Sequence, residues 1–382
     1  MGAYQQMGHN SSNLLFQDEL ADYEGAILSP VNEDEAAVRE LLERARSERP
    51  KMRMIFDPQL YVPTSNRGQL RSWKHFPDDV ESADLASEAW WTNTNKELST
   101  VVKGLGVDAA CSPVVVPRVY SDTYYARCVS VGDELGSRLP KTEVLQTVLV
   151  DLDNLTADGR PDTIASIISA SELRRVFLVV CASIEPRREI ADVDGLKGVM
   201  RLIKLLEEGG QSVLVGFCSS EVLLWKAAGA SSCATGKFFN LRRFTPSRFE
   251  EPGGGGGQLP YWFEEGLFAY LRQPDVLRVE RAIGFSDATQ RNPFTETILQ
   301  KIRAGEPWVA EGWRQFMWWF ADFEARADRA LARESLRTAE RNWRELEDRD
   351  VLMEEARNDG GWIRPWRRAV AEFDEAPPER DG

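Results

Sequence analysis

The chain has 382 residues, of which 42% are hydrophobic and 28% are charged, a balance typical of one large globular domain with an extension. Its formal net charge of -14 disfavours a free-standing nucleic-acid binder, because such proteins neutralise phosphates with basic residues. No run of about 18 apolar residues occurs in the sequence, so we expect no contact with a membrane through a spanning helix. The five cysteines are widely spaced without a CxxC pair, and we expect reduced thiols in a cytoplasmic protein.

The predicted elements begin after a polar segment, residues 1–22, which we expect to be flexible. From residue 23 onward, short apolar runs alternate with helical patterns. The runs that predict strands are 25–31, 52–56, 111–117, 144–150 and 176–182, followed by two more within 213–244. The helical patterns between them cover 36–46, 84–105, 122–139, 162–174 and 192–208.

The predicted strands are rich in Val, Leu and Ile without alternation, which indicates strands buried on both faces of a parallel sheet. Their alternation with helices indicates β/α units. Seven units are visible, and residues 259–266, after a run of glycines, are the candidate for the eighth strand. We therefore predict a (β/α)8 barrel of the TIM type over residues 23–283. An open doubly wound parallel sheet is the alternative, disfavoured because no GxGxxG follows the first strand.

Residues 284–382 are predicted to form a helical C-terminal extension. Within it, 311–323 is aromatic and 325–357 is a highly charged helix. Apolar residues recur in that helix every seven positions, at Ala325, Ala332, Ala339, Leu346 and Met353. Such a stripe predicts packing along the barrel or against a partner, and residues 311–357 are therefore the expected contact for a homo-oligomer or another protein.

Functional residues of such barrels gather at the carboxyl ends of the strands. Asp57 ends an apolar strand abruptly, and Pro58 favours an extended turn after it. A half-buried carboxyl there would have a raised pKa and act as a general base or acid, or it would cap the turn. Gln59 and Tyr61 follow in the same loop and are candidate ligand contacts.

Two other strand ends carry acidic residues. Asp151 and Asp153 are spaced to bind Mg²⁺, which prefers carboxylate ligands. They equally suit a turn or direct contact with a substrate. Glu185 precedes Arg187 and Arg188; it is a candidate catalytic group, with arginines that bind a carboxylate or phosphate, or the three form a surface ion-pair cluster.

The predicted seventh strand is followed by basic residues, a local reversal of sign in an acidic protein. Lys237, Asn240 and Arg242 lie there. Ser219 and Ser220 precede a predicted helix, and one of them would be its N-cap, next to backbone N–H groups that favour an anion. These five residues predict a phosphate or carboxylate site, and the alternative is a basic loop that neutralises acidic neighbours.

The sequence thus predicts a barrel enzyme that acts on a small anionic ligand, such as a phosphorylated sugar, a nucleotide or a nucleoside. Asp57 and Glu185 would carry protons in lyase, isomerase, transferase or hydrolase chemistry. One alternative is a non-catalytic barrel scaffold, or a subunit of a larger assembly that uses its C-terminal helices. Another is binding of single-stranded nucleic acid or tRNA through the basic loop.

Overall fold

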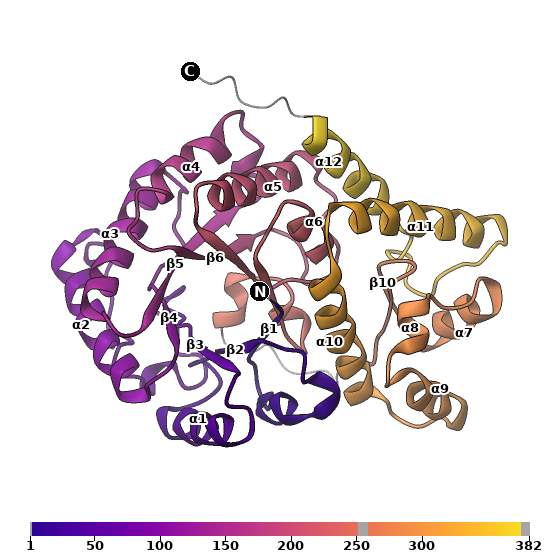
Figure 1. Cartoon of the computed structure of the whole chain (residues 1–382), viewed down its shortest axis with the longest axis horizontal. Coiled ribbons are helices and arrows are strands. Elements are labelled where there is room, and N and C mark those ends of the chain that lie inside the picture. The colour runs from indigo at the N-terminus through magenta and orange to yellow at the C-terminus, as the bar shows by residue number, and fades with distance from the viewer. Residues whose placement is uncertain (1, 251–258, 376–382) are drawn as a thin grey trace.

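The computed structural model describes residues 2–250 and 259–375. Its centre is a closed barrel of eight strands in sequence order, each parallel to its neighbours (Figure 1). The predicted (β/α)8 barrel is therefore confirmed. The strands are β1 (Tyr4–Gln6), β2 (Gly25–Leu28), β3 (Arg53–Phe56), β4 (Ala109–Cys111), β5 (Glu143–Asp151), β6 (Arg175–Cys181), β7 (Ser212–Gly216) and β8 (Ser232–Thr235).

Close packing inside the barrel follows from the alternation of side chains along each strand. Val176 and Leu178 of β6 share a buried apolar cluster with residues of the outer helices. The intervening Phe177 points to the other face, where it meets β7. A Cβ added at Gly216 would lie 2.5 Å from the Phe177 ring. The barrel accommodates a large aromatic in its interior because a neighbouring strand supplies glycine.

A ring of helices surrounds the barrel. Two 3-10 turns, η1 (Ser12–Phe16) and η2 (Asp18–Leu20), follow β1 in place of a helix. Next in the ring come α1 (Glu35–Glu48), α2 (Glu88–Leu105), α3 (Asp122–Arg138), α4 (Arg160–Ile168), α5 (Val193–Glu208) and α6 (Val222–Ala227).

The last place in the ring belongs to a helix far along the chain. α10 (Val309–Arg326) packs against β8 and α6 and lies beside β1 (Figure 1). The Tyr23 hydroxyl donates a 2.9 Å hydrogen bond to the Met317 carbonyl oxygen, which joins the β1–β2 connection to α10. The predicted barrel region and the predicted extension therefore share one core.

Two sequence predictions are wrong at the ends of the barrel. Residues 1–22 are not a segment outside it, because Tyr4–Gln6 is its first strand. Residues 259–266 do not supply the eighth strand: β9 (Trp262–Glu264) pairs only with β10 (Ala269–Leu271), in a separate antiparallel hairpin. The seven other predicted strands correspond to β2–β8, although β4 ends at Cys111, shortly before Pro113, which offers no backbone donor. The glycine run lies outside the described residues.

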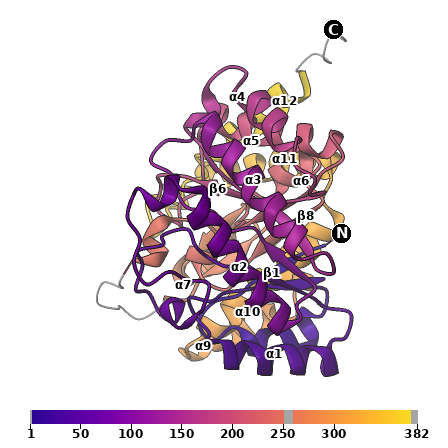
Figure 2. The same ribbon diagram turned by 90° about the vertical axis from the view of Figure 1, so that its left-hand side faces the viewer.

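Most of the described chain after β10 is helical and forms a second layer beside the barrel (Figures 1 and 2). Besides α10, the helices after β10 are α7 (Gln273–Ala282), α8 (Asp287–Arg291), α9 (Thr295–Ala304), α11 (Arg329–Asp348) and α12 (Ile363–Glu375). α11 packs against α6 and α12, and α12 packs along α5. The apolar stripe of α11 is thus buried by the chain itself, at Ala332, Leu336, Ala339 and Leu346.

Two general expectations can be compared with the structure. All five cysteines are free and buried. Among the helices of residues 2–250 and 259–375, none combines the length and apolarity needed to cross a membrane.

Candidate functional site

Asp57 lies at the carboxyl end of β3, on the same face of the strand as Ile55. Its side chain is buried, with 1% of the residue exposed. The Gln59 backbone N–H donates to Asp57 Oδ1 and the Tyr61 hydroxyl donates to Oδ2, both at 3.0 Å. Burial raises the pKa of Asp57 to about 7, although these hydrogen bonds and the charge of Arg248 favour the ionised form. Asp57 can therefore gain or lose a proton near neutral pH.

Gln59 holds the loops after β2 and β3 together. Its side-chain Oε1 accepts hydrogen bonds from Ser29 Oγ and from the Val31 backbone N–H, each at 3.1 Å. Its backbone is left-handed, with φ of 52°, a conformation that costs energy for a residue with a side chain. Its Nε2 is buried without a hydrogen-bond partner among the described residues. The predicted ligand contact therefore has an unused donor.

Arg248 brings a buried cation close to Asp57. It lies in the turn η7 (Pro246–Phe249) after β8, and its Nη2 is 3.3 Å from Ser29 Oγ. Burial lowers the pKa of Arg248 to about 10, against the effect of the Asp57 charge. Its Nε has no hydrogen bond within the described part of the chain. A cation with a free N–H beside a carboxyl can bind an anionic group.

Aromatic rings close the barrel mouth above these residues. The Phe244 ring lies 4.9 Å from Tyr61 and 5.3 Å from Phe217, and the Phe249 ring lies 5.4 Å from Tyr61. Ser65 Oγ donates to the Phe249 carbonyl oxygen and fastens the loop. All four aromatic residues are buried. The segment from 244 to 249 is thus the cover of the mouth.

A second buried polar cluster joins the ends of the last three strands. Glu189 follows β6, Glu221 follows β7 and Arg243 follows β8. Arg243 Nη2 lies 3.6 Å from Glu189 Oε2 and 3.4 Å from Glu221 Oε1, and the three side chains are at most 5% exposed. Burial and the neighbouring Glu221 raise the pKa of Glu189 to about 8, although Arg243 opposes this. The two carboxyls titrate as a pair, and burial makes the pair bind a proton more tightly than an exposed carboxyl does.

The basic residues after β8 have structural partners. The Arg242 guanidinium donates to the carbonyl oxygens of Gly236 and Lys237, each at 2.9 Å, and stacks 3.7 Å from the Phe316 ring of α10. Lys237 Nζ donates to the Asn10 carbonyl oxygen at 2.7 Å. Arg242 and Lys237 thus fasten the loop after β8 to its surroundings.

The remaining members of that predicted site differ in their surroundings. Asn240 is exposed. Ser219 Oγ lies 2.8 Å from the Tyr270 hydroxyl, and Ser220 Oγ donates to Glu189 Oε1 at 2.6 Å. Neither serine caps α6, a helix of 6 residues without a side-chain cap. The predicted N-cap is therefore wrong, because the helix is short and both serines have other partners.

Glu185 and Arg187 belong to an ion-pair cluster outside the barrel mouth. Glu185 is 43% exposed and pairs with Arg357 at 2.5 Å and with Arg187 at 3.4 Å. Arg187 also lies 3.5 Å from Glu355. A carboxylate that is exposed and paired with two guanidinium groups forms a surface ion pair. This arrangement is the surface cluster that the sequence left open, and the predicted catalytic role of Glu185 is not supported by its position.

The two aspartates proposed for Mg²⁺ close the turn after β5. Asp151 Oδ1 accepts a 3.1 Å hydrogen bond from the Asn154 backbone N–H, and Asp153 is exposed. Among residues 2–250 and 259–375, no group of three or more His, Cys, Asp or Glu is placed to hold a metal ion. Of the arrangements that the sequence allowed for Asp151, the structure shows the turn. Among the described residues, Asp151 and Asp153 do not belong to a group of three or more possible metal ligands.

The sequence predicted three residues of the barrel mouth but not Arg248, the buried cation beside them. Asp57, Gln59 and Tyr61 were all predicted, and the structure brings them together. Arg248 was missed because it follows β8 by 13 residues, beyond the strand end where such residues are sought. Glu189 was also missed, because it lies beyond the end of β6 and directly after Arg187 and Arg188, to which the sequence drew attention.

No known protein family and no curated protein matches the chain. Among solved structures, the putative copper homeostasis protein CutC from Streptococcus agalactiae is 11% identical and matches 64% of this chain and 100% of its own, with a TM-score of 0.39. A mutant xylanase from Cellvibrio japonicus is 8% identical over 61% of this chain and 85% of its own, with a TM-score of 0.37. A GH18 chitinase from Pseudoalteromonas aurantia is 13% identical over 63% and 95%, with a TM-score of 0.39. Likenesses this distant carry no argument about function.

Proposed function

We propose that this protein is a barrel enzyme that performs acid–base chemistry on a small anionic ligand in the barrel mouth. Asp57 is the proton carrier and Arg248 binds the anionic group. The observation that carries the proposal is a buried carboxyl with a pKa of about 7 beside a buried guanidinium with an unused N–H. The carboxyl ends of the strands, where both lie, are the usual place for catalysis in such barrels.

The chemistry follows from the charges. A carboxyl whose pKa is close to the working pH accepts a proton from one ligand atom and returns it to another with little energetic cost. Arg248 Nε and Gln59 Nε2 are donors without partners among the described residues, and they suit the oxygens of a carboxylate or phosphate. Tyr61 positions Asp57 through its hydroxyl. Arg248 favours phosphorylated sugars and nucleotides over a nucleoside, which has no anionic group.

Entry of the ligand requires movement of the cover. Asp57 is 1% exposed beneath Phe244 and Phe249. The cover is a loop with short turns rather than a long helix or strand, and such segments open at low cost in enzymes. Displacement of Phe249 would break its contacts with Tyr61 and Ser65 and expose Asp57.

The experiment is incubation of the purified protein with a cell metabolite extract, followed by mass spectrometry. We expect the wild type to convert at least one anionic compound. The Asp57→Asn variant should slow that conversion about 100-fold or more, as loss of a general acid or base does. Asp153→Asn is the matched control and should behave as the wild type. Conversion by Asp57→Asn at the wild-type rate, or an extract unchanged by the wild type, would contradict the proposal.

A further inference from the structure

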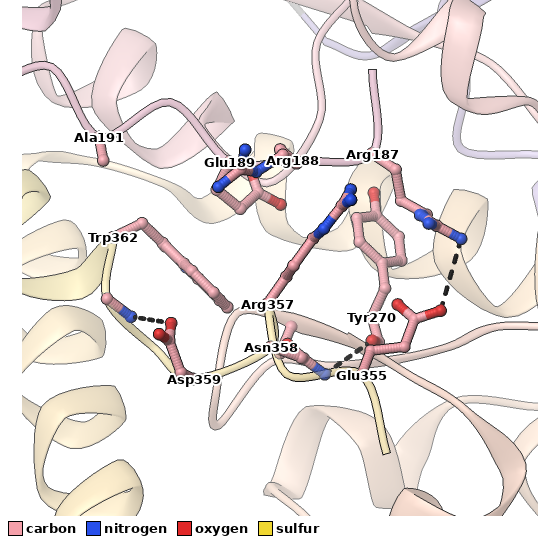
Figure 3. A pocket seen from close by; sticks show the side chains of 12 residues that line it. Arg187, Arg188, Glu189, Ala191, Tyr270, Glu355, Arg357, Asn358, Asp359 and Trp362 are labelled. Atoms are coloured by element: carbon pink, nitrogen blue, oxygen red, sulfur yellow. Dashed lines mark hydrogen bonds and ion pairs between the residues drawn. The ribbon is translucent and has the colours of Figure 1, made fainter. Parts of the chain in front are cut away.

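A cavity of about 230 Å³ lies between the loop after β6 and the segment that joins α11 to α12 (Figure 3). Figure 3 shows residues 187–189 on one side, Tyr270 in the middle, and residues of the joining segment on the other. Pockets for drug-sized ligands usually exceed about 300 Å³. This cavity is therefore suited to a small metabolite. Its residues are disjoint from Asp57, Gln59, Tyr61 and Arg248.

Guanidinium groups dominate the charge of the cavity wall. Arg187, Arg188 and Arg357 line it, against the carboxylates of Glu355 and Asp359. Burial and the neighbouring Glu221 raise the pKa of the third acidic residue of the wall, Glu189, to about 8. Three guanidinium groups thus gather in one cavity, although the whole protein is strongly acidic. Such a local concentration of positive charge attracts anions.

Arg188 and Arg357 differ in how they are held. The Arg188 side chain has no hydrogen bond or ion pair with any described residue. Arg357 pairs with Glu185, which lies outside the cavity lining, and reaches across the cavity toward residues 187–189 (Figure 3). Arg188 is thus free to bind a ligand, and Arg357 has donors to spare because a guanidinium carries five.

The base of the cavity holds a buried ion pair. The Glu189 side chain is 5% exposed, and its Oε2 lies 3.6 Å from Arg243 Nη2. Arg243 lies behind Glu189, and its Nη2 is also 3.4 Å from Glu221 Oε1. These groups pair with one another, so ligand binding in the cavity depends on the arginines of its wall.

We propose that this cavity is a second binding site, which takes a small ligand by its carboxylate or phosphate group. The oxyanion pairs with Arg188 and Arg357. This site is separate from the proposed catalytic mouth and does not depend on it.

A purely structural role is the competing explanation for two of the arginines. Arg187 and Arg357 bridge to Glu355 and Glu185 and so fasten the joining segment to the barrel. That explanation gives no role to Arg188. Arg188→Gln is therefore the deciding variant, since it should fold as the wild type and lose only ligand contacts.

The test is isothermal titration calorimetry of the full-length protein with inorganic phosphate and, separately, with succinate. We expect at least one to bind with a Kd below about 1 mM. Arg188→Gln and Arg357→Gln should each weaken that binding about 10-fold or more, the usual effect of losing a charge-assisted hydrogen bond. Glu189→Gln should bind within about threefold of the wild type, because the Glu189 carboxyl is already held by Ser220 and Arg243 and the ligand pairs with the arginines.

Arg368→Gln is the matched control, because Arg368 lies exposed on α12 and pairs only with Glu372 among the residues that the structure describes. It should bind as the wild type. Binding of succinate alone identifies a carboxylate ligand, and binding of phosphate alone identifies a phosphate ligand; either supports the site. No binding of either compound, or equal binding by Arg188→Gln and the wild type, would overturn the proposal.

Discussion

Replacement of Asp57 by asparagine should change how the stability of the protein depends on pH. The pKa of Asp57 is raised from 3.8 to about 7 in the folded protein, chiefly by burial. The folded state therefore binds this proton more tightly than the unfolded state does. The stabilisation is fully present below about pH 4 and is lost as the pH rises to about 7.

The magnitude follows from the size of the shift. A rise of about three pKa units, at about 1.4 kcal/mol for each unit, corresponds to about 4 kcal/mol of unfolding free energy. An asparagine side chain has no proton to lose in this range, so the Asp57→Asn variant should not show this loss. The variant should therefore gain about 4 kcal/mol relative to the wild type between about pH 4 and pH 7.5.

The assay is urea unfolding of both proteins at several pH values across that range. Other titrating groups, such as Glu189, are present in both proteins and cancel in the difference. The reasoning would be refuted if the difference between the two unfolding free energies stayed constant within about 1 kcal/mol, because the folded pKa of Asp57 would then be close to its ordinary value.

Two further predictions concern the packing of the C-terminal part on the barrel. Arg242→Met should lower the unfolding free energy by about 3 kcal/mol, because it leaves two buried carbonyl oxygens unpaired and removes the stacking on Phe316. Chemical unfolding measures this loss, and a loss no larger than that of Arg368→Gln would contradict the prediction. A chain that ends at residue 283 should fail to fold cooperatively, because it lacks α10 and exposes β8 and α6; a sharp thermal transition followed by circular dichroism would show that α10 is dispensable.

The inner strands could be predicted because they obey the rule for buried parallel sheets. β5 and β6 contain long runs of Val and Leu, and each is followed by a helix with a clear apolar face. β1 has the sequence YQQ, three residues without an apolar pattern, and it could not be recognised. Polar residues in a barrel strand break the local rule, and such exceptions are expected near functional sites.

The last place in the helical ring could not be predicted for a different reason. β8 ends at Thr235 and α10 begins at Val309, so the helix that covers the strand lies far along the chain. The spacing of β/α units carries no information about so distant a contact. Arg248 and Arg243 were hard to single out for a similar reason. The Arg242 side chain donates to backbone carbonyl oxygens, whereas among the described residues Arg248 and Arg243 have side-chain N–H groups without a hydrogen bond. Tertiary packing decides this difference, and the sequence does not show it.

The central claim is that the ligand reacts beside Asp57. The most direct measurement is a crystal structure of the Asp57→Asn variant with the compound that the wild type converts. We predict that the anionic group of the compound contacts Arg248 and that an exchangeable or reacting atom lies about 3 Å from the side chain of residue 57. A structure in which the compound binds only elsewhere and the barrel mouth holds none would contradict the assignment of the barrel mouth as the active site.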